Sequence, residues 1–266
     1  MSVSYAELLL LGTLAGFTIF LGLPLAFMPK VGNKTKSFLT VFSAGVLIFL
    51  LYEIIEEVLE EIGEHYAEVS QGTGSSGELV SLVAIFLVSV IVGLGGLVWF
   101  ENRFINRDTS NLSSSWKSGY LALMIAIGIG LHNFGEGLAI GQAFIQGSLA
   151  LAFTLIIGFG LHNATEGFGI VAPISGEKPK VSFLALLGLI GGGPTFLGTL
   201  VGSFYASKML EIIFMSLAAG SILYVVIKLF QVQYKMKEYQ AAIVGAIAGF
   251  FLAWVGEWVT KVSMRI

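Results

Sequence analysis

The stretch Gly-Leu-His-Asn-x-x-Glu-Gly occurs twice in the chain, at 130–137 and at 160–167, each time inside a long apolar run. Residues i and i+4 project from one face of an α-helix, so the histidine and the glutamate of each copy would lie side by side, with the asparagine on the adjoining face. Imidazole nitrogens and carboxylate oxygens are ligands of divalent transition metals. The candidate metal ligands are therefore His132, Glu136, His162 and Glu166.

Composition indicates that these helices lie in a membrane. Hydrophobic residues make up 56% of the chain, charged residues only 12%, and the mean hydropathy is +0.88. Soluble domains carry about 25% charged residues, so we interpret the chain as an all-α integral membrane protein. It contains no cysteine, which excludes disulfides and thiolate metal sites. One histidine or asparagine in a membrane helix is usually an interhelical hydrogen bond, but the duplicated pattern with its carboxylates favours metal binding.

Eight apolar stretches are long enough to span a membrane, since a span needs roughly 20 mostly apolar residues. They form one transmembrane domain, 1–266, with both termini on the same side. The N-terminus lacks the basic region and cleavage site of a removable signal, so we expect the first stretch to be a permanent span. The predicted helices lie near 5–28, 37–61, 78–100, 117–143, 147–174, 181–207, 209–233 and 239–262.

The distribution of lysine and arginine predicts the orientation. With the termini outside, the inner loops and helix ends hold eleven of the fourteen basic residues, and the outer side holds three. Because basic residues concentrate on the inner side of membrane proteins, this asymmetry places both termini outside. The three outer basic residues are Lys208, Lys261 and Arg265.

Internal repeats extend beyond the twin motif. Residues 42–50 resemble 217–225, and residues 16–22 resemble 192–198, so the first two helices look like the sixth and seventh. In the predicted topology each pair crosses in opposite directions, and inverted repeats are typical of transporters. The turn near Gln146 lies 14 residues after His132 and 16 before His162. We therefore expect the two motifs to meet at the same depth.

The His-Asn-x-x-Glu-Gly motif on the fourth helix, its partner on the fifth and the outward termini resemble the ZIP family (Zrt/Irt-like proteins) of divalent metal transporters. The resemblance implies a 3+2+3 helix arrangement, with His132, Glu136, His162 and Glu166 as main-site ligands. It also implies that Asn133 and Asn163 are ligands of a neighbouring metal position. The chain departs from the family at Gly135 and Thr165, where relatives carry proline, at Gly193, where many carry glutamate, and at Lys228, where glutamate is frequent. A binuclear site is therefore not expected.

Two imidazoles and two carboxylates suit Zn²⁺, and the same set serves Fe²⁺, Mn²⁺ or Co²⁺, with Cd²⁺ as a further candidate. Two glutamate charges neutralise a divalent ion, which matters because an unpaired charge at the membrane centre costs at least about 3 kcal/mol. Protons compete for both ligand types, so metal binding should be sensitive to pH.

A second charged feature is the outer end of the second predicted helix, where seven glutamates and His65 occur within 53–68. This acidic stripe could concentrate cations at an entrance, or it could be a solvated helix end. Glu53 is the deepest of the seven and is a candidate metal ligand in transit. The others are Glu56, Glu57, Glu60, Glu61, Glu64 and Glu68.

We therefore predict a multi-pass carrier of the cell membrane that moves a divalent metal ion, most simply inward. No ATP-binding Gly-x-x-x-x-Gly-Lys-Ser/Thr loop occurs, and we expect no enzymatic activity, no organic cofactor and no nucleic-acid partner. Lipid and the metal ion are the expected partners, and a homodimer is one option for so small a bundle. The alternatives are an intramembrane metalloenzyme and a receptor or structural protein whose polar residues only join helices.

Overall fold

The computed structural model describes the chain except residues 1–3, 28–31, 105–113, 146–148, 205–207 and 264–266; some helical side chains, His162 among them, also lie outside the description. The described residues form eight α-helices and contain no strand. The α-helices are α1 (Tyr5–Phe17), α2 (Asn33–Ser70), α3 (Ser76–Phe104), α4 (Ser114–Ile145), α5 (Leu149–Val171), α6 (Val181–Gly202), α7 (Lys208–Met236) and α8 (Tyr239–Ser263). The 3₁₀ segments Thr18–Leu21 and Leu23–Phe27 continue α1, and Ala172–Ile174 continues α5.

The predicted all-helical membrane fold is confirmed for the described residues, among which seven helical segments are long and apolar enough to cross a membrane. The side chains of α5 are described only in part, and α5 is not among the seven, so the span predicted at 147–174 stays a prediction. The second predicted span, near 37–61, lies within α2, and the helix itself continues to Ser70. Glutamate and alanine favour helix in water as well as in lipid, so the helix continues beyond its apolar residues.

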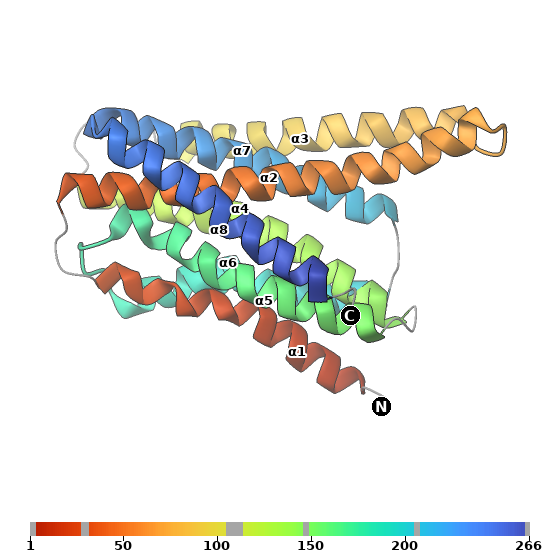
Figure 1. The fold of residues 1–266 in the computed structure, drawn as a ribbon, viewed down its shortest axis with the longest axis horizontal. Coiled ribbons are helices and arrows are strands. Elements are labelled where there is room, and N and C mark those ends of the chain that lie inside the picture. The colour runs from red at the N-terminus through yellow and green to blue at the C-terminus, as the bar shows by residue number, and fades with distance from the viewer. Residues whose placement is uncertain (1–3, 28–31, 105–113, 146–148, 205–207, 264–266) are drawn as a thin grey trace.

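The helices lie in two groups (Figure 1). One group contains α2, α3, α7 and α8, and the other contains α1, α5 and α6, with α4 packed on both α6 and α7. Helix α1 begins and α8 ends at the same end of the bundle, where the turn between α2 and α3 projects furthest (Figure 1). That arrangement agrees with termini on one side; which side faces outward stays a prediction.

Helices α2 and α8 approach so closely that only glycine fits at two points between them. A Cβ atom on Gly45 of α2 would collide with the Ala246 carbonyl oxygen of α8, and a Cβ on Gly249 would collide with the Phe42 carbonyl. Each collision involves backbone, which cannot swing aside as a side chain can. The α2–α8 contact therefore depends on both glycines.

The α7–α3 pair repeats this arrangement. A Cβ on Gly220 of α7 would collide with the Val90 carbonyl of α3, and a Cβ on Gly93 would collide with the Leu217 carbonyl. Gly45 and Gly220 occupy equivalent positions in the two sequence repeats, as do Phe42 and Leu217. The two helix pairs thus use equivalent residues at equal spacing.

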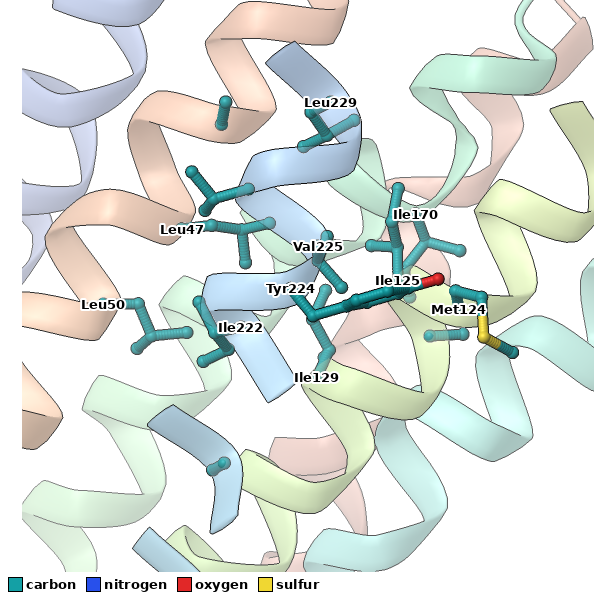
Figure 2. Packing of buried hydrophobic residues seen from close by; sticks show 14 of the residues in the cluster. Leu47, Leu50, Met124, Ile125, Ile129, Ile170, Ile222, Tyr224, Val225 and Leu229 are labelled. Carbon is teal, nitrogen blue, oxygen red and sulfur yellow. The ribbon is translucent and has the colours of Figure 1, made fainter. Parts of the chain in front are cut away.

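Apolar side chains fill the space where α2, α4, α5 and α7 meet (Figure 2). Those on α4 precede His132 in the chain, so they lie between the motif and the end at which α4 begins. Each is at most 4% exposed, so this part of the bundle is closed by packed hydrocarbon. They include Leu47, Leu50, Ile125, Ile129, Ile170, Ile222 and Val225.

Candidate functional site

The motif on α4 is buried in the middle of the bundle. His132 is 3% exposed, and Asn133 and Glu136 are 0% exposed. The His132 Nε2 atom lies 3.0 Å from Glu136 Oε1. The i, i+4 pairing expected from the sequence is therefore present.

The motif on α5 is buried to the same degree, with Asn163 at 0% and Glu166 at 2% exposure. His162 is helical in its backbone, but its side chain lies outside the described residues. Among the described side chains, no group of three or more histidines, cysteines, aspartates or glutamates could hold a metal ion. The predicted four-ligand site, including the two glutamates, therefore stays a prediction.

A short hydrogen bond joins the two motifs. Asn133 Nδ2 donates to Asn163 Oδ1 at 2.6 Å, and both side chains are buried. Asn163 Nδ2 in turn lies 3.5 Å from Glu136 Oε2, so α5 places a donor beside the carboxylate of α4. The two motifs meet at one depth, as their similar spacing from the intervening turn predicted.

The same two amides bind backbone carbonyls on two other helices. Asn133 Nδ2 donates its second hydrogen to Gly191 O of α6 at 3.0 Å, and Asn163 Nδ2 donates to Ala15 O of α1 at 3.3 Å. Helices α1, α4, α5 and α6 are thus connected at this level. Sequence reasoning missed both carbonyls; the nearby Pro194 and the end of α1 at Phe17 were the signals that could have indicated them.

The departures from the family motif have structural counterparts. Helix α4 is continuous through Gly135, and the Met215 Sδ atom of α7 lies 3.1 Å from where a Cβ on Gly135 would be. Gly193 has open space, with no atom within 4 Å of an added Cβ. Lys228 pairs with Glu101 of α3, its Nζ lying 2.7 Å from Oε1 and 2.6 Å from Oε2. The Lys228 ammonium is thus held by a carboxylate of the neighbouring helix.

The side chains of the acidic stripe are mostly exposed. On α2, Glu53 is partly exposed and Glu56 is exposed, and the role of Glu53 as a ligand in transit stays a prediction. His65 lies between two helices, with Nδ1 3.9 Å from Glu61 Oε1 and Nε2 3.9 Å from Glu78 Oε1 of α3. His65 belongs to the last turns of α2 and Glu78 to the first turn of α3, and the turn between these two helices projects from the bundle (Figure 1).

Comparison with protein families gives one match that covers this site. Residues 103–252 match the family model described as ZIP zinc transporter, which is more than half of the 266-residue chain. The matched segment includes both motifs and the helices α4 to α7. Comparison with curated proteins gives no match.

Proposed function

Because the chain belongs to the ZIP zinc transporter family, we propose that it carries a divalent transition metal, Zn²⁺ foremost, across the cell membrane and inward. The proposed transport site is formed by His132 and Glu136 of α4 with His162 and Glu166 of α5. The family is one of transporters, and divalent metal transport is the activity it implies. The chain is a multi-pass membrane protein by its apolar helices.

The observation that carries the proposal is the buried contact between the motifs, with Asn133 and Asn163 only 2.6 Å apart and the His132–Glu136 pair beside them. Polar and ionisable groups in the interior of a membrane bundle are expensive and are usually functional. A bound divalent cation would offset that cost, because two carboxylates neutralise its charge.

The roles of the ligands follow from their chemistry. The ion would exchange its hydration water for imidazole nitrogen and carboxylate oxygen. Asn163 would hold the Glu136 carboxylate in place through its amide, as groups around a metal site do for the ligands themselves. Glu53, on α2, would meet the ion on its way in from the acidic outer end.

One divalent ion per site is favoured over two. Gly193 supplies no side-chain ligand, although the space beside it is open. Asn133 and Asn163 are neutral, so a second divalent ion would find no carboxylates beyond the two already used.

We also propose that transport proceeds by alternating access between inverted repeats. The matched glycine contacts of the α2–α8 and α7–α3 pairs support the repeat, because equivalent residues make equivalent contacts in both. The packed apolar side chains around Ile125 and Val225 lie between His132 and the end of the bundle at which α4 begins, and they close the route in that direction. Release on that side then requires α4 to move relative to α7.

Metal uptake into proteoliposomes tests this function, with Zn²⁺, Fe²⁺, Mn²⁺, Co²⁺ and Cd²⁺ compared. We expect His132→Ala and His162→Ala each to lower uptake at least about tenfold, as removal of a metal-site group does. His65→Ala is the matched control, since His65 is the only other histidine, and it should retain uptake. Equal uptake by all three variants would favour a structural role for the motifs, and product formation by metal-loaded protein would favour a metalloenzyme.

A further inference from the structure

Two helices depart from regular α-helical hydrogen bonding near Asn133. Helix α1 ends at Phe17 and continues as a 3₁₀ segment, and α6 contains Pro194. Proline has no N–H, so the carbonyl of Ile190 lacks its usual helical donor. That carbonyl is turned toward α4, where a Cβ on Gly130 would collide with it. Paired interruptions in corresponding parts of two repeats are where transporters bind their ions.

Two buried oxygens at this level have no hydrogen-bond partner among the described residues: Asn133 Oδ1 and Thr195 Oγ1. Both residues are 0% exposed. A helical threonine usually bonds to the carbonyl four residues earlier, and Thr199 does so, donating to Thr195 O at 2.9 Å. Thr195 does not bond to Gly191 O in this way, and that carbonyl accepts Asn133 Nδ2 instead.

Both side chains belong to the surroundings of the Gly191 carbonyl, because Asn133 Nδ2 of α4 donates to it at 3.0 Å and Thr195 stands one helical turn further along α6. The Thr195 hydroxyl is also turned toward α1, 2.7 Å from where a Cβ on Gly16 would lie. A buried acceptor without a partner is costly, so this arrangement points to a ligand between α1, α4 and α6.

The donor set selects the ligand. An amide oxygen, a hydroxyl and a backbone carbonyl are hard and uncharged, which suits a hard cation and not a transition metal. A divalent ion held by these groups alone would lack countercharge. A monovalent ion would need one negative charge, and Glu136 lies next to this group, linked to it through Asn163 at 3.5 Å.

We propose that Asn133 Oδ1, Thr195 Oγ1 and the Ile190 carbonyl line a site for Na⁺ beside the transport site. The ion serves as countercharge to the glutamates in the metal-free carrier, and in this respect the inference rests on the proposed function. Na⁺ is then released when the divalent metal takes over the carboxylates, so high Na⁺ weakens apparent metal affinity.

The melting temperature of the purified, chelator-treated full chain in detergent tests the site. At equal ionic strength, NaCl should raise the melting temperature above that in choline chloride, by about 2–5 °C at ten times the dissociation constant, and saturably. Thr195→Val keeps the side-chain shape without the hydroxyl, and should need at least about tenfold more Na⁺ for the same rise. Thr195→Ser and the matched control Thr199→Val should respond as the parent does.

Identical melting temperatures of the parent chain in NaCl and choline chloride would overturn the site and leave a buried water as the partner of both oxygens. A full Na⁺ response in Thr195→Val would overturn the assignment of its hydroxyl. If that variant does not fold, ²²Na⁺ binding is measured on the parent and on Thr195→Ser. Binding by both supports the site, and binding by neither overturns it. Metal uptake without any Na⁺ response refutes only this inference, whereas a Na⁺ response without metal uptake refutes only the transport function.

Discussion

The amide pair between the two motifs should be energetically coupled. We consider Asn133→Ala, Asn163→Ala and the double variant. Each single change leaves the buried amide of the other residue without its partner, which costs about 1–3 kcal/mol of unfolding free energy. The double change removes both ends of the amide–amide bond together, and Ala15 O still accepts from Thr18 Oγ1 at 2.7 Å. Glu136 Oε2 loses its Asn163 donor in both Asn163→Ala and the double variant, so this loss cancels in the cycle.

The coupling energy can be placed within a range. Interhelical hydrogen bonds in membranes contribute about 0.6 kcal/mol on average and at most about 1.7 kcal/mol in double-mutant cycles. The bond here is short, 2.6 Å, and both residues are 0% exposed. We therefore expect a coupling in the upper half of that range, about 1.1–1.7 kcal/mol.

Equilibrium unfolding in mixed micelles of a mild detergent and dodecyl sulfate measures the four free energies. Asn133→Ala combined with Ser81→Ala is the control, since Ser81 lies exposed on α3 and bonds within its own helix to Gly77 O at 2.8 Å. That pair should be additive within about 0.5 kcal/mol. A coupling of the two asparagines no larger than that of the control would mean that α4 and α5 do not meet at this level.

Three further predictions concern packing, charge and pH. Gly192→Ala should destabilise the protein by about 1–3 kcal/mol, because the added Cβ would collide with the Gly16 carbonyl. Gly193→Ala should be neutral or stabilising by up to about 1 kcal/mol, and thermal unfolding of the two variants checks both expectations. Lys228→Met should lower the unfolding free energy by about 1–3 kcal/mol, because it leaves Glu101 without its cation. The loss is smaller than for a fully buried pair, because the two side chains are 24% and 16% exposed. Adding Glu101→Gln to Lys228→Met should recover most of the lost free energy in the same unfolding assay. Initial rates of metal uptake should fall as the pH is lowered, since protons compete with the metal for imidazole and carboxylate ligands, and a rate that rises on acidification would instead point to proton-driven transport.

Much of the site was predictable because its chemistry is local. The i, i+4 spacing alone brings His132 to Glu136, and the turn spacing alone predicts that Asn133 and Asn163 share a depth. What the sequence could not supply were contacts between distant segments. No periodicity connects Asn163 to the carbonyl of Ala15, because backbone acceptors carry no sequence signal unless a helix break exposes them.

The fold shows the same division. Hydropathy indicated the long apolar helices, since the lipid requirement is a property of each segment by itself. It did not indicate how far α2 continues, because Glu64 and Ala67 extend the helix beyond its apolar residues. The Lys228–Glu101 pair was also missed, since nothing in the sequence shows that the C-terminal parts of α3 and α7 lie side by side.

The most direct test of the transport site is X-ray absorption at the zinc edge of the Zn²⁺-loaded protein. We predict one zinc with nitrogen and oxygen neighbours at about 2.0–2.1 Å, two of them imidazoles. His132→Ala and His162→Ala should each remove one imidazole, and His65→Ala should remove none. A spectrum with no imidazole, or one unchanged by both motif variants, would contradict the proposal that α4 and α5 enclose the metal between them.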